Sequence, residues 1–146
     1  MKQFTIKYHK LNNNAILPTR GSDYAAGYDL YACINNSVTI QPHQTVKIGT
    51  GLSFELPEGT YAAIFARSGL ATKLGIRPAN CVGVCDSDYR GEYIVALHND
   101  SEWDVTIQPG ERVAQMILQE YISMDFIEGD LSETERGTGG FGSTGQ

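Results

Sequence analysis

The chain has 146 residues, of which 41% are hydrophobic and 19% charged, so its length suits one domain with a substantial hydrophobic core. Its formal net charge of −6 argues against binding of nucleic acid, because proteins that bind the phosphate backbone usually present a basic face. No apolar run approaches the ~20 residues that a membrane helix needs, so no association with a membrane is expected.

Short apolar segments separated by turn residues follow one another along the chain. Residues 3–8 alternate Phe4, Ile6 and Tyr8 with polar neighbours, which predicts a half-buried strand and not a signal peptide. Asp29 enters another short strand, and further strands are predicted over residues 37–40, 45–50, 52–56, 60–65, 105–107 and 113–122. Strands that arrive about every 8 to 12 residues with Gly and Pro between them indicate an all-β sandwich, barrel or jelly roll.

One segment, residues 68–74, has the spacing of a short helix. Ser68 is a candidate N-cap, and Gly75 can close the C-terminus. Arg67, Ser68 and Gly69 at its start could bind an anion, because free backbone N–H groups and the helix dipole both favour negative charge there. The alternative is a capped helix with a surface arginine.

Residues 82–97 predict two antiparallel strands joined by a short loop. Val82 and Val84 lead into Asp86, a turn-rich stretch follows, and residues 93–97 return as an apolar strand. A carboxylate where the first strand ends could hold a water, and Tyr89 could form a floor beneath a flat ligand. Alternatively, Asp86 simply caps a surface turn.

Gln115 is a polar residue inside an otherwise apolar strand. A buried amide must find hydrogen-bond partners. It could satisfy neighbouring backbone groups, hold a substrate oxygen or orient Asp86.

Three cysteines, Cys33, Cys81 and Cys85, form no disulfide framework, because the count is odd and the spacing unsuitable. The three histidines are scattered, so no zinc site is expected. Reduced thiols are typical of a cytoplasmic protein.

The chain ends in a glycine-rich tail, which we expect to be mobile. Its glycines, Arg136, Ser143 and Thr144 could wrap phosphates, and Phe141 could stack on a base with about 1–3 kcal/mol of stabilisation. A flexible terminus of no consequence is the alternative.

Five segments in this order closely resemble the five motifs of the trimeric dUTP pyrophosphatases (dUTPases): AGYDL (26–30), RSGLA (67–71), GVCDSDYRG (83–91), GERVAQ (110–115) and RGTGGFGSTG (136–145). Each motif alone is weak evidence, but five in order with suitable spacing are very specific. Cys85 departs from the family, which more often has an aliphatic residue there, and we expect it to be a packing substitution.

The resemblance implies a jelly-roll-like β domain over residues 1–128, with one short helix, and a mobile arm over residues 129–146 that closes over an active site. It implies a homotrimer with shared active sites. The extended arm could span ~60 Å, whereas such a domain has a radius of gyration of ~15 Å, so the arm could reach a neighbour. The implied enzyme is a dUTP diphosphatase that hydrolyses dUTP to dUMP and pyrophosphate with Mg²⁺, which lowers dUTP and supplies dUMP for dTMP synthesis.

The resemblance also implies roles for individual residues. Asp86 would be the general base for water attack on the α-phosphate, and Tyr89 would lie under the deoxyribose. Asp29 would hold Mg²⁺ through water, which suits an ion that keeps much of its hydration shell. The implied contacts to the base are Asn80, Gly83, Val84 and Cys85; those to the phosphates are Arg67, Ser68, Gly69, Gln115 and Arg136; and those from the closing arm are Phe141, Gly142, Ser143 and Thr144.

Two other functions remain open at this point. One is a dCTP deaminase-type enzyme, whose catalytic segment finds no match in this chain. The other is a regulatory protein in which nucleotide occupancy switches an interaction.

Overall fold

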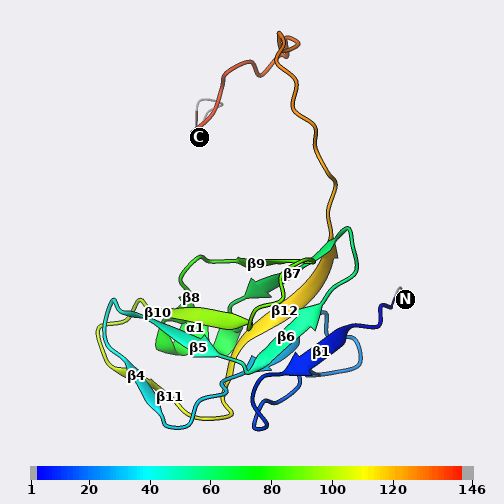
Figure 1. Ribbon diagram of the computed structural model, residues 1–146. Helices are drawn as coiled ribbons and strands as arrows, with labels where there is room; N and C mark the ends of the chain where they lie inside the picture. The colour runs from blue at the N-terminus through cyan, green and yellow to red at the C-terminus, as the bar shows by residue number, and fades with distance from the viewer. Residues whose placement is uncertain (1–2, 143–146) are drawn as a thin grey trace.

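The computed structural model describes residues 3–142 of the chain, and the regular secondary structure of this part is antiparallel strands and one short helix (Figure 1). The strands are β1 (Lys7–Lys10), β2 (Thr19–Arg20), β3 (Tyr28–Tyr31), β4 (Val38–Ile40), β5 (Thr45–Gly49), β6 (Leu52–Glu55), β7 (Thr60–Phe65), β8 (Ile76–Pro78), β9 (Gly83–Asp86), β10 (Ile94–Asn99), β11 (Val105–Ile107) and β12 (Arg112–Glu120). The predicted all-β class is therefore confirmed.

Two larger sheets carry most of the fold. One has five strands in the order β2-β3-β12-β7-β9, and the other has three in the order β5-β10-β8. Two-stranded ladders, β1-β6 and β11-β4, complete the domain. Alternating side chains from both larger sheets meet in one core that includes the fully buried Leu30, Ile48, Leu97 and Val113.

The predicted helix is confirmed as α1 (Ser68–Leu74), but its N-cap is wrong. The N-cap residue is Arg67, with extended backbone (φ −87°, ψ 131°), and no side chain caps the helix. Ser68 is already helical, so its hydroxyl cannot take the capping geometry. Gly75 closes the helix in the left-handed conformation with φ 68°, as predicted.

The first predicted strand is displaced along the chain. It runs over Lys7–Lys10 because β6 pairs with those residues. Ile6 packs against the core, whereas Phe4 and Tyr8 remain 37% and 50% exposed. β2 and β8 were not predicted from the sequence, because each has at most three residues and contains or follows a proline.

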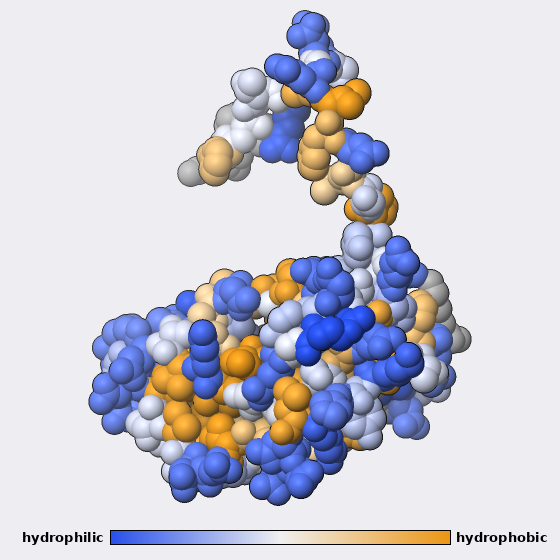
Figure 2. Space-filling view, in the orientation of Figure 1, coloured by the Kyte–Doolittle hydropathy of each residue, from blue (hydrophilic) through white to orange (hydrophobic). Residues whose placement is uncertain are grey.

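The last strand, β12, ends at Glu120, and the chain then leaves the sheets as an arm over residues 121–142 without helix or strand (Figure 1). Figure 2 shows hydrophobic residues interspersed along this arm. Ile122, Phe126, Ile127 and Leu131 are 87–94% exposed. The boundary expected after residue 128, and the mobility of the arm, remain predictions. No helix within residues 3–142 is long and apolar enough to cross a bilayer.

Candidate active site

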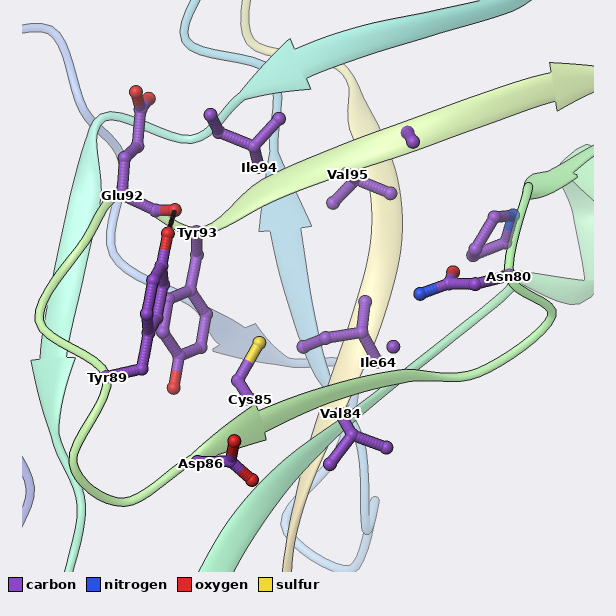
Figure 3. Close-up of a pocket in the computed structure, with 13 residues that line it drawn as sticks. Ile64, Asn80, Val84, Cys85, Asp86, Tyr89, Glu92, Tyr93, Ile94 and Val95 are labelled. Carbon is purple, nitrogen blue, oxygen red and sulfur yellow. Dashed lines mark hydrogen bonds between the residues drawn. The ribbon is translucent and has the colours of Figure 1, made fainter.

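The strands on either side of Asp86 do not form the hairpin that the sequence predicts. β9 pairs with β7 in the five-stranded sheet, and β10 pairs with β5 and β8 in the other sheet. The two strands are instead the opposite walls of a hollow of about 270 Å³ (Figure 3). The short loop still joins them, but each strand finds its ladder partners elsewhere.

Both walls present strand edges to this hollow. β9 is the last strand of its sheet, so the backbone groups on its far side have no ladder partner within the described residues. β8 covers β10 only at Leu97–Asn99, which leaves the edge of β10 open around Ile94 and Val95. Open strand edges offer backbone donors and acceptors at fixed spacing to a planar ligand.

The side chains that line the hollow combine an apolar floor with polar ends. Ile64 and Val95 form the floor, and Asn80 points in from the loop before β9 (Figure 3). At the other end, Tyr89 is held by its hydroxyl, which donates to the Glu92 carbonyl at 3.0 Å. A largely apolar pocket with a few fixed polar groups suits a flat, polar-edged molecule.

Asp86 ends β9, as predicted, but its side chain and that of Val84 lie on the face opposite Cys85 (Figure 3). The carboxylate is exposed, and within residues 3–142 no hydrogen bond or ion pair engages it. Asp86 also borders a second hollow beside Asp88 and Arg90. The carboxylate is therefore available to a ligand outside the chain's own core.

Cys85 and Tyr93 lie together on the inner face of the first hollow. Tyr93 is 2% exposed, and its hydroxyl makes no hydrogen bond of ordinary geometry with a described residue. Burial, and then the neighbouring Cys85 thiol, raise the pKa of Tyr93. Burial, and then the charge of Asp86, raise the pKa of Cys85. Both groups are thus neutral at neutral pH, and Cys85, which packs against the core, is a poor nucleophile.

A second cluster of predicted site residues lies at the other end of the five-stranded sheet. Arg67 Nε donates to Asp29 Oδ1 at 2.8 Å, and Arg112 Nη1 donates to Asp29 Oδ2 at 3.2 Å. Gln115 sits opposite Asp29 in the ladder, and its Nε2 donates to the Ala66 carbonyl at 2.9 Å. We call these residues, Asp29, Arg67, Arg112 and Gln115, the arginine cluster.

Gly27 is required where Gln115 lies. A Cβ on Gly27 would be 2.3 Å from Gln115 Oε1, so a side chain there would displace the amide.

Of the three roles predicted for Gln115, satisfying the backbone is confirmed by its bond to the Ala66 carbonyl. Orientation of Asp86 by Gln115 of the same chain is wrong, since the two residues lie on opposite sides of β7.

The distance between the two clusters follows from the strand register. Along β7, Tyr61 faces Asp86 on one side and Phe65 faces Gln115 on the other. With a rise of ~3.3 Å per residue and ~4.8 Å between strands, the backbones of Asp86 and Gln115 are about 16 Å apart. Arg67 is farther still along the same direction.

Arg112 was not predicted as a site residue. It pairs with Tyr31, and the register shifts between Arg112 and Ala114. That irregularity brings an arginine three positions before Gln115 to the same carboxylate, which strict alternation would not do. Only its position within the fourth motif could have indicated it.

Asp29 is the residue of the arginine cluster that could face a metal ion. Each carboxylate oxygen accepts one bond from an arginine and keeps a further lone pair for the water shell of an ion. Within residues 3–142, no three His, Cys, Asp or Glu side chains could together hold a metal ion. Such a carboxylate can accept bonds from the water shell of an ion, and the described residues offer no cage of protein ligands.

As far as residue 142, the arm extends away from the sheets that carry both clusters (Figure 1). Arg136 Nε donates to the Gly139 carbonyl within the arm, at 2.8 Å, and Phe141 and Gly142 are exposed. Ser143 and Thr144 lie outside the described residues. Ser68 and Gly69, at the start of α1, are exposed beside the arginine cluster.

Comparison with known proteins gives a consistent result. The family model described as dUTPase matches residues 13–145. A deoxyuridine 5'-triphosphate nucleotidohydrolase of Desulfitobacterium hafniense (strain DSM 10664 / DCB-2) is 48% identical over 142 residues, which cover 96% of this chain and 94% of that protein.

Solved structures agree in fold. The Staphylococcus bacteriophage 80alpha dUTPase with dUPNHPP has a TM-score of 0.87 at 25% identity and covers 99% of this chain and 100% of that one. A mutant dUTPase from phage phi11 of S. aureus, whose structure reveals the coordination of a structural Mg(II) ion, has a TM-score of 0.80 at 20% identity, covering 90% and 100%. These likenesses confirm the predicted jelly-roll-like fold.

Proposed function

The chain belongs to the dUTPase family and hydrolyses dUTP to dUMP and pyrophosphate, and from that premise we propose which residues bind the base, activate the water and bind the phosphates. It is a dUTP diphosphatase of nucleotide metabolism, which lowers dUTP and yields dUMP. Its relatives are named for this hydrolysis, so neither the deaminase nor the binding-only alternative is supported.

The hollow between β9 and β10 takes the uracil. Open backbone groups around Gly83 and Val84, together with Asn80, pair with the edge of the base, while Cys85 packs in the wall beneath it. Cytosine would leave such groups unpaired, and this kind of mismatch can reject an analogue by roughly 10⁴-fold. Tyr89, held at the other end, lies under the deoxyribose and leaves no room for a 2′-hydroxyl.

Asp86 is the general base. Its exposed carboxylate at the end of β9 accepts a proton from a water aligned with the α-phosphorus. The attacking oxygen then bonds to that phosphorus as the bond to the β-phosphate oxygen breaks, so pyrophosphate leaves and dUMP remains.

The arginine cluster and the start of α1 bind the phosphates. Arg67, Ser68, Gly69 and Gln115 supply donors to the phosphate oxygens. Mg²⁺, held through water by Asp29, would neutralise charge on the triphosphate within a chain that is itself anionic. The arm adds Arg136 as a cation for the terminal phosphate and Phe141, Gly142, Ser143 and Thr144 as a cover.

Three observations support a site shared between copies of the chain in a homotrimer. Asp86 and the arginine cluster lie on opposite sides of β7, with the backbones of Asp86 and Gln115 about 16 Å apart, so they do not form one compact site within a single chain. Asp86 also faces outward from the core. The exposed apolar side chains of the arm, such as Phe126 and Ile127, are the kind of surface that a second copy buries.

A mixing experiment tests the shared site. Asp86→Asn and Arg67→Gln chains should each be inactive alone, but refolding them together at equal amounts should restore about a quarter of the sites, those in which intact residues of two chains meet. Co-refolded wild-type chains serve as the control for recovery. No restoration in mixed trimers would place both residues of each site in one chain and end the proposal.

Substrate preference and metal dependence form a second test. Pyrophosphate release should be far faster with dUTP than with dCTP, dTTP or UTP. A chelator should suppress release without unfolding the protein, because the described residues form no metal cage on which folding depends. Circular dichroism of the chelated sample is the control, and undiminished release there would remove Mg²⁺ from the proposal.

We place the enzyme in the cytoplasm. Cys33, Cys81 and Cys85 are all free thiols, which suits a reducing compartment.

A further inference from the structure

Arg77, outside every predicted motif, joins the body of the domain to the loop beside the hollow. It lies in β8 opposite His98 of β10. Its Nε donates to Asp100 Oδ2 at 2.6 Å, and its Nη2 donates to Asp100 Oδ1 at 3.0 Å. This two-pronged geometry fixes the plane of the guanidinium. The backbone of Asp100 is itself anchored, since its N–H donates to the Gly75 carbonyl at 2.8 Å.

The remaining nitrogen of the Arg77 guanidinium, Nη1, contacts the loop over residues 78–82. Arg77 Nη1 donates to the carbonyls of Pro78 at 3.2 Å and Ala79 at 3.3 Å, and lies 3.9 Å from Cys81 Sγ. Asp100 thus fixes the Arg77 side chain, and Arg77 in turn donates hydrogen bonds to two successive backbone carbonyls of the loop. A lysine could not do both, because its ammonium lacks a planar fork.

The loop held in this way carries Asn80 into the hollow (Figure 3). Its backbone is unusual: Cys81 has φ 62°, a left-handed conformation that residues other than glycine seldom adopt. The Val82 N–H donates to the Asn80 carbonyl at 2.7 Å, so the turn is tight. Such a conformation persists only where surrounding contacts impose it.

We propose that Arg77 and Asp100 form a clamp that positions the 78–82 loop, and through it Asn80, for reading the base. Arg77 is a positioning residue: it acts on the loop and touches neither the substrate nor the reacting atoms. The inference rests on the proposed function, in which this hollow takes the uracil. The clamp should therefore affect binding and choice of the base, and leave the chemical step at Asp86 unchanged.

Steady-state kinetics of Arg77→Met and Asp100→Asn with dUTP and dCTP test the clamp. We expect each variant to raise KM for dUTP about fivefold, to keep kcat within about twofold, and to lower the preference for dUTP over dCTP about fivefold. The double variant should have the same KM and the same preference for dUTP as either single variant, because each substitution breaks the same Arg77–Asp100 contact. Asp100→Asn, which preserves shape, keeps the test valid if Arg77→Met folds poorly.

Two controls separate the possible outcomes. Lys7→Met breaks an ion pair of similar length, Lys7 Nζ to Glu55 Oε1 at 2.9 Å, in the β1-β6 ladder, and should change neither KM nor preference. Asn80→Ala tests the hollow itself. If Asn80→Ala raises KM and the clamp variants do not, the clamp is refuted while the proposed base site stands. If Asn80→Ala also leaves KM and preference unchanged, the proposed base site fails. A parallel fall of kcat and melting temperature in both clamp variants would show a merely structural role and overturn the inference.

Discussion

Replacing Asp86 by Asn is expected to lower kcat by about 10³-fold or more while binding of a non-hydrolysable nucleotide survives. The amide keeps the shape of the carboxylate but cannot accept the proton of the attacking water, and general-base catalysis alone contributes roughly 10² to 10⁴-fold. Alignment of the water is lost as well, which adds to the effect. Folding should be unaffected, because no described residue bonds to this carboxylate. Single-turnover kinetics and calorimetric titration with the analogue measure the two quantities separately.

Asp88→Asn is the matched control for this prediction. Asp88 is an exposed carboxylate in the loop that follows Asp86, and of the two hollows it borders only the second. Its removal changes the local charge equally but should leave kcat within about twofold. Near-normal turnover in the Asp86→Asn protein, or an equal loss in both variants, would contradict the role assigned to Asp86.

Deleting residues 136–146 is expected to leave a folded assembly with at least ~100-fold lower kcat/KM. The deletion removes Arg136, the proposed cation for the terminal phosphate, and Phe141, whose proposed stacking on a base would contribute about 1–3 kcal/mol. β12 ends at Glu120, so no strand of the core is cut. Size-exclusion chromatography with light scattering measures assembly, and initial rates with dUTP measure activity.

Point variants locate the effect within the arm. Phe141→Ala should lose about tenfold in kcat/KM, in line with the loss of one stacking contact. Phe141→Tyr keeps an aromatic ring and is the control, with an expected change of less than about twofold. Full activity of the truncated protein would refute the idea that the arm closes over an active site.

Several elements follow from local patterns. The continuous apolar run at Thr60–Phe65 and the alternation at Val105–Ile107 both give strands with the predicted bounds, the first buried on both faces and the second on one. The helix at Ser68–Leu74 and its end at Gly75 follow from apolar spacing and from the freedom of glycine at positive φ. Asp86 lies where its strand ends because the turn-rich residues after it cannot continue a ladder.

Strand pairing is where the sequence misled. The short loop between β9 and β10 predicts a hairpin, but β7 offers β9 an edge and β5 offers β10 another. Local loop length cannot report that competition, because the competing edges belong to strands far away in the chain. The outcome matters for function, since a paired hairpin would have no hollow between its strands.

The amino-acid sequence by itself determined the all-β class, the short helix and the five motifs that mark the family, because these depend on neighbours along the chain. Only the tertiary structure decided that Asp86 and the arginine cluster lie on opposite sides of β7. It also decided that a shift in register brings Arg112 to Asp29, and that Arg77 donates hydrogen bonds to the loop carrying Asn80. The physical reason is that register, bulges and long side-chain contacts arise from packing between distant segments, which no local pattern encodes.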